Sequence, residues 1–556
     1  MKERTVDAAI AGALGLSQAS YLLVTADDLG YARDEGFYVM AARSYRRWFE
    51  LLASEPSSAL SAVDRYFAVN HEHPALMKLS FSLSHWLFHD RLGLISQPGT
   101  AYRLPSMLLA GLAVAVIYLW GRRELGRGAG LVAALAFAFL PRVFFHAHLA
   151  CFDLPVAALG LLTAYCYARS LSSPRLGWAL GAGVCFGVAL GTKHNAWFLP
   201  IIFGLHLLLV RGRSLAGGLR RGRLAIPRVW LALVVLGPLV FYLGWPWLWS
   251  DPLSRVGEYV EFHLTHEYYN IEFLGLTYYQ PPFPRTYAWG MTLATVPLST
   301  LLLFALGAAT ALRAALASAR RDGWFCGGLS SASATWSLWL IAVAVNYAPW
   351  LSRGTPIFGG TKHWMTAYPF LCLLGGLGFR ELSTALLALA RSRPRFRERA
   401  SVERAVPLLA AGALLAAPLA ITLDSHPFGL SAYTPIAGGA PGAASLGLNR
   451  GFWGYTTGAL TEYLNRTAPP GARIYLHDTL GSSFDLLRLD GRLRSDLRGT
   501  PDLAASEIAL YHHEPHMSRV ESQIWVLYGS VTPAAVATHD GVPVAWVYRR
   551  PKTSPR

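Results

Sequence analysis

Two neighbouring carboxylates near the N-terminus, Asp34 and Glu35, are the residues of this chain best suited to catalysis. A carboxylate within hydrogen-bond reach of a hydroxyl can act as a general base and activate that hydroxyl for attack. The same acids could instead only mark the start of a helix, because Asp is favoured at an N-cap and acidic residues are favoured in a first turn. The residue types alone leave both interpretations open.

Basic side chains farther along the chain could complete a site for group transfer from a lipid phosphate. Four of them are expected at the outer ends of apolar segments: Lys78, Arg103, Lys193 and Lys362. Fixed cations of this kind stabilise a leaving phosphate, while the attacking hydroxyl needs a carboxylate base. One carboxylate is sufficient for a single displacement with inversion at a sugar carbon, because a phosphate leaves without a second catalytic acid.

Some of these residues also have a simple structural explanation. Asp153 could join the site, or it could cap the helix expected to begin at Leu154-Pro155. Lys193 and Arg103 could bind phosphate, or they could only extend towards lipid headgroups.

Two histidine-containing stretches lie later in the sequence. His263, His266 and Tyr269 could bind a sugar or an acceptor through polar groups and ring faces, or they could belong to a surface helix. The stretch Tyr511-His-His-Glu-Pro-His516 lacks the His-x-x-x-His spacing of a helical zinc site. No metal ligand is predicted there.

The composition predicts a polytopic membrane protein. The 556 residues are 53% hydrophobic and only 15% charged, which is too apolar and too long for one soluble core. A net charge of +16 would suggest a nucleic-acid partner in a soluble protein, but here the basic residues lie between apolar segments, so membrane lipids are the expected partner. The five cysteines form no CxxC pair and predict neither a disulfide framework nor a metal site.

About eleven apolar segments are expected to span the membrane. The first, at about residues 6–24, is either a signal anchor or a cleavable signal, and an anchor is favoured. The others lie at about 102–120, 128–145, 154–169, 176–191, 195–210, 229–248, 287–312, 335–350, 363–390 and 403–423. Several are shorter than the roughly 20 residues of an upright span, so their boundaries are approximate.

The arginines indicate an orientation, because basic residues resist translocation. They are concentrated in alternate connections, such as residues 211–228 and 391–404, which are expected in the cytoplasm. The candidate site residues then all lie on the outer side, together with the C-terminus.

Two polar regions are expected outside the membrane. In the first outer loop, residues 25–101, large apolar residues recur at three- to five-residue steps from Phe37 to Leu52, which is typical of an interfacial helix. Residues 425–556 are expected to form a small α/β domain beside the transmembrane catalytic domain of residues 1–424. Strand-like runs there lie at Arg473–His477, Gln523–Tyr528 and Val542–Tyr548.

The order of the motifs resembles that of the GT-C glycosyltransferases, and within them the branch of the protein O-mannosyltransferases and lipid A aminoarabinose transferases. The acidic pair precedes His73-Pro-Ala-Leu-Met-Lys78, Arg103-Leu-Pro105 and Asp153-Leu-Pro155. Further matches are Gly191-Thr-Lys-His-Asn195, Tyr278-Tyr-Gln-Pro-Pro-Phe283 and the stretch from Lys362 to Phe370. The resemblance covers roughly residues 1–425.

This resemblance implies an inverting enzyme that transfers one sugar from a polyprenyl-phosphate carrier to a protein, lipid or glycan acceptor outside the membrane. Asp34 corresponds to the catalytic base, Glu35 to a second acid and Asp153 to the acid of a later outer loop. The residues expected to bind the donor phosphate are His73, Lys78, Arg103, Lys193, Lys362 and His363. Relatives often carry two prolines where this chain has His73-Pro-Ala, so the resemblance does not decide which of His71, His73 and Lys78 contacts phosphate.

Several points stay open. No cofactor is assigned, although Asp34, Glu35 and Asp153 could share a divalent cation. The composition favours a bacterial inner membrane and a role in the cell envelope. The main alternative is a transporter or flippase of lipid-linked or anionic solutes, and a catalytically idle scaffold is another.

Overall fold

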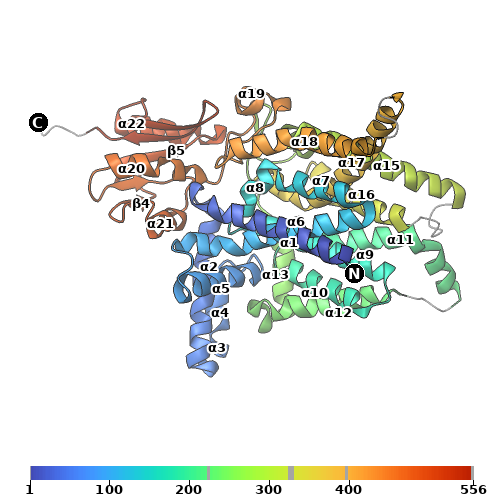
Figure 1. Cartoon of the computed structure of the whole chain (residues 1–556). Helices are drawn as coiled ribbons and strands as arrows, with labels where there is room; N and C mark the ends of the chain where they lie inside the picture. Colours follow the sequence, from blue (N-terminus) through green and yellow to red (C-terminus); the bar gives the residue numbers. More distant parts are fainter. Residues whose placement is uncertain (1, 222–225, 323–330, 358, 395–398, 552–556) are drawn as a thin grey trace, which may run out of the picture.

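The computed structural model describes residues 2–221, 226–322, 331–357, 359–394 and 399–551. Arg223, Cys326, Arg395 and Arg397, which entered the expectations above, lie outside these ranges. The described chain is a helical bundle with a small sheet region at one end (Figure 1).

A helix occupies every predicted apolar segment. Within the described ranges, seven helices are long and apolar enough to cross a membrane: α1 (Lys2–Val24), α6 (Pro98–Leu125), α9 (Asp153–Ser172), α11 (Phe198–Arg220), α15 (Leu298–Asp322), α17 (Tyr368–Arg391) and α18 (Ala400–Ser425). The count becomes eight if α7 (Arg127–Ala138) and α8 (Pro141–His148), which bend by 65°, form one span. The polytopic helical fold is confirmed, but the count of eleven spans is not, since α10 (Leu176–Leu190), α12 (Arg228–Leu243) and α16 (Ser331–Tyr347) are shorter.

Proline sets two breaks in the bundle. Pro141 begins α8 after an extended Leu140, because a proline disfavours helical backbone at the residue before it. The predicted segment 287–312 is likewise divided into α14 (Tyr287–Thr295) and α15, with an extended Val296 before Pro297. Arg142, which directly follows the first break, lines the cavity described below.

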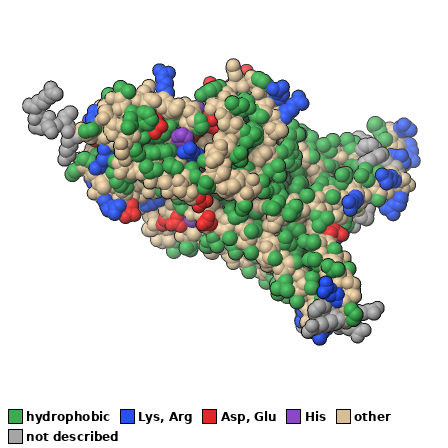
Figure 2. Space-filling model, turned by 90° about the horizontal axis from the view of Figure 1, so that it is seen from above, with side chains coloured by type: hydrophobic (Ala, Val, Ile, Leu, Met, Phe, Trp, Pro, Cys, Tyr) green, Lys and Arg blue, Asp and Glu red, His purple; other side chains and the backbone are tan. Residues whose placement is uncertain are grey.

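The bundle has a centre and a lipid-facing periphery. The most apolar windows of α6, α9 and α17 are 67%, 61% and 61% buried, whereas those of α1 and α18 are 17% buried. Figure 2 shows a largely apolar surface over the bundle, with Lys and Arg gathered where helices project away from the sheet region. This distribution is typical of an integral membrane protein.

The first outer loop folds into short helices. They are α2 (Arg33–Ser54), α3 (Pro56–Ser61), α4 (Val63–Phe67), α5 (Leu76–Ser84) and a π-helical turn, η2 (His85–Arg91). Of the large apolar residues of α2, Tyr45 and Trp48 pack against the protein, while Phe37 and Met40 are exposed.

A second segment outside the helical bundle connects α12 to α14. It contains η4 (Pro246–Trp249), α13 (Pro252–Leu264) and a hairpin of β1 (Ile271–Phe273) and β2 (Leu276–Tyr278). The short turns η5 (Ala348–Leu351), η6 (Gly360–His363) and η7 (Met365–Ala367) precede α17.

The C-terminal region contains a five-stranded sheet in the order β4-β3-β5-β7-β6. Its strands are β3 (Arg473–Tyr475), β4 (Arg498–Thr500), β5 (Ile508–His512), β6 (Ala535–His539) and β7 (Val542–Arg549). β3 runs parallel to β4 and β5, while β7 pairs antiparallel with β5 and β6. The helices beside it include α20 (Thr461–Thr467), α21 (Gly481–Leu489) and α22 (Ser518–Tyr528) (Figure 1).

The predicted α/β character is confirmed, but the strand predicted at Gln523–Tyr528 is wrong, because these residues end α22. Ile524 and Tyr528, four residues apart, form the buried face of that helix. The core of this region also includes Leu29, Tyr31 and Val39 from the first outer loop. The C-terminal region is thereby packed against the start of α2.

Candidate active site

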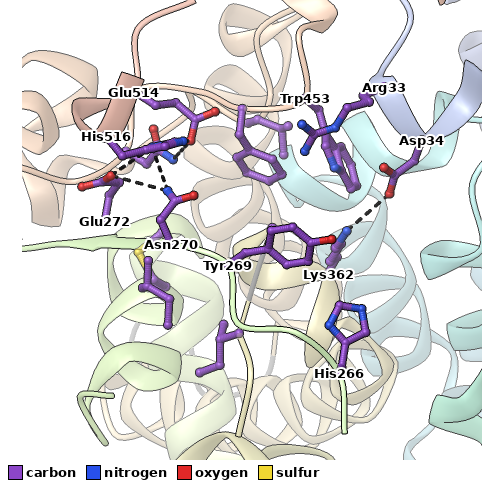
Figure 3. A pocket seen from close by; sticks show the side chains of 18 of the residues that line it. Arg33, Asp34, His266, Tyr269, Asn270, Glu272, Lys362, Trp453, Glu514 and His516 are labelled. Carbon is purple, nitrogen blue, oxygen red and sulfur yellow. Dashed lines mark hydrogen bonds and ion pairs between the residues drawn. The ribbon is translucent and has the colours of Figure 1, made fainter. Parts of the chain in front are cut away.

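A cavity of about 530 Å³ lies where three distant parts of the chain meet. The first turn of α2 contributes Asp34, the η6 turn contributes Lys362, and the C-terminal region contributes Trp453 (Figure 3). The segment around the β1–β2 hairpin forms the opposite wall. The cavity is therefore built by the segment containing α2, the segment between α12 and α14, the C-terminal region and the end of the bundle.

Asp34 and Lys362 form an ion pair in this cavity. Asp34 Oδ2 and Lys362 Nζ are 3.5 Å apart, and the side chains are 23% and 6% exposed (Figure 3). Lys362 Nζ also lies 4.2 Å from the centre of the Trp453 ring. Burial lowers the pKa of Lys362, while the charges of Asp34 and Asp153 act in the opposite direction. The carboxylate that the sequence proposes as a base is thus held beside a cation and open to the cavity.

A smaller pocket of about 60 Å³ continues from the same residues. Asp34, His73 and Lys362 line both spaces, and the small pocket also contains Asp153 and Lys193. Lys193 Nζ donates a hydrogen bond to Asp153 Oδ1 at the first residue of α9. We call this space the inner pocket; it contains two lysines, each paired with a carboxylate.

Two histidines of the inner pocket, His73 and His263, are held neutral by burial, which lowers the pKa of each ring. The ring of His73 packs against Tyr38 and Phe152 at centre distances of 5.8 and 5.5 Å. Burial lowers the pKa of His73 well below its usual range, and the charge of Lys78 adds to this effect. Burial also lowers the pKa of His263 to about 3. A neutral imidazole can still donate one hydrogen bond to a phosphate oxygen.

Glu35 and Arg103, predicted to act in catalysis and phosphate binding, line neither the cavity nor the inner pocket. Both side chains are fully buried, and Arg103 Nε and Nη2 donate to the two carboxylate oxygens of Glu35 at 2.7 and 2.8 Å. The amides of Ala32 and Ala150 donate to the same carboxylate, each at 2.9 Å. Glu35 therefore holds the start of α2 against the segment that leads into α9.

Lys78, also predicted to bind phosphate, makes its hydrogen bonds within the first outer loop. Its buried ammonium donates to the carbonyl oxygen and side-chain oxygen of Asn70 and, at 2.8 Å, to the carbonyl oxygen of His73. It does not line either space. Its three hydrogen bonds fix the loop that carries His73.

The remaining predicted residues divide between the two spaces. His266 and Tyr269 line the large cavity, with His266 at the junction of both. His263, on α13, lines the inner pocket, where its ring centre is 4.1 Å from that of His194. His363 also lines the inner pocket, and its carbonyl oxygen accepts a hydrogen bond from Asn195.

An acidic wall opposite Asp34 was missed by the sequence analysis. His516 Nδ1 lies 3.3 Å from Glu272 Oε1 and 3.8 Å from Glu514 Oε2, and Asn270 Nδ2 lies 2.9 Å from the same nitrogen (Figure 3). Burial raises the pKa of Glu514 to about 8, assisted by the charge of Asp478. The histidine-rich stretch 511–516 was the sequence signal for this wall, but the sequence analysis assigned it no role.

The three acids do not converge as a shared divalent cation would require. Glu35 faces Arg103, and Asp34 and Asp153 each lie against a lysine ammonium, which repels a cation. Among the described residues, three potential metal ligands converge at His85, His89 and Asp90, outside both spaces.

Comparison with known proteins connects this geometry to a family. Residues 73–245 match the family model described as "Dolichyl-phosphate-mannose-protein mannosyltransferase". This match confirms the predicted resemblance to the GT-C glycosyltransferases. The chain is a polytopic helical membrane protein, and its residues 73–245 are similar to this family.

Similar solved structures carry related descriptions. ArnT from Cupriavidus metallidurans bound to undecaprenyl phosphate is 17% identical, with a TM-score of 0.47 over 98% of this chain and 99% of that one. The Archaeoglobus fulgidus oligosaccharyltransferase in the apo form is 11% identical, with a TM-score of 0.47 over 93% and 72%. Arabinosyltransferase EmbB from Mycobacterium smegmatis is 15% identical, with a TM-score of 0.34 over 79% and 43%. No curated protein sequence matches the chain significantly.

Proposed function

We propose that this protein transfers a single sugar from a polyprenyl-phosphate carrier to a protein, lipid or glycan acceptor outside the cytoplasm, with inversion at the sugar carbon. The observation that carries the proposal is the Asp34–Lys362 pair at the junction of the large cavity and the inner pocket. The name of the matching family supports a polyprenyl-phosphate sugar as the donor.

The donor phosphate is assigned to the inner pocket. Lys193 and Lys362 supply positive charge there, and the neutral ring of His73 can donate a hydrogen bond. A polyprenyl chain would then extend into the bilayer, and the sugar would lie near Asp34.

The acceptor is assigned to the large cavity, which the C-terminal region helps to form. Its hydroxyl oxygen forms a bond with the anomeric carbon while the bond from that carbon to the phosphate oxygen breaks. The hydroxyl proton passes to Asp34, and the polyprenyl phosphate leaves with the electron pair and a negative charge that Lys193 and Lys362 stabilise. Attack from the face opposite the phosphate inverts the carbon.

The proposal is tested by replacing Asp34 with Asn in membranes that contain equal amounts of each variant. Loss of a general base is expected to reduce sugar transfer from a polyprenyl-phosphate sugar by roughly 10²–10⁴-fold. Glu50→Gln is the matched control, because Glu50 is an exposed acid on the same helix. Transfer by Asp34→Asn at the wild-type rate would overturn the assignment.

The acceptor and the location can be identified in cells. Mass spectrometry of envelope lipids and proteins, with and without the chain, is expected to show one class of molecule that loses a single sugar. A bacterial inner membrane with the cavity on the outer side is part of this proposal.

A transporter or flippase is less consistent with the position of the charged groups. Transporters bind their cargo near the bilayer midplane, often between broken helices. Here Asp34 lies in the first turn of α2, Asp153 begins α9 and Lys362 precedes α17, so the groups that face the cavity gather at helix ends.

A further inference from the structure

Arg142 lies in the large cavity and has no role in the reaction described above. It is the second residue of α8, directly after the proline that bends the bundle. Its side chain lines the cavity although the residue is only 3% exposed. A guanidinium remains charged under all ordinary conditions, so this charge is permanently buried beside the substrate space.

The other cations of the two spaces have carboxylate partners. Lys362 lies against Asp34, Lys193 against Asp153, and Arg33 Nη1 lies 3.4 Å from Asp478 Oδ1. Within the described ranges Arg142 makes no ion pair, and its Nε and Nη2 atoms are buried without a hydrogen-bond partner. It is thus the one Lys or Arg lining either space that lacks a counter-charge in the described part of the chain.

The neighbours of Arg142 do not supply that charge. Its Cζ lies 5.1 Å from the centre of the Tyr433 ring. Burial raises the pKa of Tyr433, and its hydroxyl donates to the carbonyl oxygen of Asn449 at 2.6 Å, so this phenol is neutral. Tyr287 also lines the cavity and adds a second phenol.

The carboxylates of the acidic wall have other partners. Glu272 accepts a hydrogen bond from Thr277 at 2.6 Å and faces His516, while Glu514 accepts one from Asn449 at 3.2 Å. Glu514, with its pKa raised to about 8, is also mostly protonated at neutral pH.

An isolated buried charge is costly, and removing the partner of a buried ion pair is strongly destabilising for this reason. Ionisable side chains in a membrane protein that lack such a partner usually mark a substrate path. The most direct compensation for a guanidinium is a planar or tetrahedral oxyanion that accepts two parallel hydrogen bonds.

We propose that Arg142 binds an anionic group, a phosphate or a carboxylate, of the molecule that occupies the large cavity. The inference rests on the proposed glycosyl transfer and names its substrate class. One substrate must place a negatively charged group beside Arg142. This group is either the donor phosphate itself or a second anionic group on the acceptor or the sugar. Arg142 is then a specificity-determining residue that favours anionic over neutral substrates.

The test uses the full chain in nanodiscs and the variants Arg142→Gln and Arg142→Lys. The probes are inorganic phosphate and polyprenyl phosphate, and binding is measured by the rise in melting temperature on titration. Arg285→Gln is the matched control, because Arg285 is an exposed arginine in an outer segment. Inorganic phosphate is expected to bind Arg142→Gln roughly 10- to 100-fold more weakly than it binds wild type. Its affinity for Arg142→Lys is expected to lie between those two values.

The two probes distinguish the source of the anion. If polyprenyl phosphate also binds Arg142→Gln more weakly, the anion is the carrier phosphate. If polyprenyl phosphate binds normally, the anion belongs to the acceptor or the sugar. Wild-type affinity of Arg142→Gln for both probes would overturn the proposal.

A second readout separates binding from a structural role. Because the guanidinium is uncompensated, Arg142→Gln without ligand is expected to melt at the same temperature as wild type or higher. A lower melting temperature without ligand would assign Arg142 to the fold and overturn the proposal. Asp34→Asn is expected to lose sugar transfer and Arg142→Gln is expected to lose anion binding, so failure of the transfer mechanism and failure of anion binding are seen in different variants.

Discussion

Glu35 and Asp34 are adjacent in sequence, yet the structure assigns them different tasks, and replacing each one alone tests this. In Glu35→Gln the guanidinium of Arg103 loses its counter-charge inside the protein, where both side chains are 0% exposed. The four hydrogen bonds that the Glu35 carboxylate accepts, two from Arg103 and two from backbone amides, are also weakened or lost. Breaking a buried pair from one side costs roughly 3–5 kcal/mol.

The assay is thermal unfolding of the full chain in nanodiscs, followed by tryptophan fluorescence, together with sugar transfer below the melting temperature. Glu35→Gln is expected to lower stability by about that amount, whereas Asp34→Asn is expected to lower it by less, because Lys362 also lies near the charge of Asp153. Replacing both Glu35 and Arg103 with apolar residues should cost less than the sum of the single changes.

One result would refute this reasoning. If Glu35→Gln kept wild-type stability but lost transfer to the same extent as Asp34→Asn, Glu35 would be acting on the substrate. The buried pair could then not be the arrangement in the active protein.

Two further predictions concern positioning residues. Lys78→Met is expected to lower stability by roughly 1–3 kcal/mol and to raise the KM for the polyprenyl-phosphate sugar, because the loop carrying His73 loses its ammonium donor; a higher KM with unchanged stability would show direct phosphate binding instead. His477 Nε2 accepts the amide of His512 at 2.9 Å, and burial lowers the pKa of His477 to about 3. As the pH falls, His477 therefore takes up a proton in the unfolded chain near pH 6.5 but stays neutral in the folded chain. This difference lowers the free energy of unfolding by about 1.4 kcal/mol between pH 7.5 and 5.5. His477→Gln is expected to lose less stability than wild type between pH 7.5 and 5.5, as measured by unfolding at both pH values. An equal loss in the variant and the wild type would show that His477 does not cause the pH dependence.

The sequence determined the helical membrane fold and the residues at the ends of its helices. Apolar segments such as 102–120 and 403–423 lie within α6 and α18, because a lipid environment requires backbone hydrogen bonds to be satisfied within a helix. Asp34, Asp153 and Lys362 were found from residue type and position alone, and all three line the two spaces. The strand predicted at 523–528 was wrong because a short apolar run has no distinct period, so burial against the sheet decided its conformation.

Only the tertiary structure decided which charged groups face the cavity. Adjacent residues of a helix point about 100° apart, so one of Asp34 and Glu35 had to turn away from the cavity, and the choice depended on where Arg103 packs, 68 residues later. The positions of Glu514, His516 and Arg142 depended in the same way on contacts between distant segments. A residue's type limits the chemistry it can perform, but folding decides which partner compensates its charge. For this reason Lys362 and Asp34 face the cavity. Lys78 and Glu35 instead have partners inside the protein.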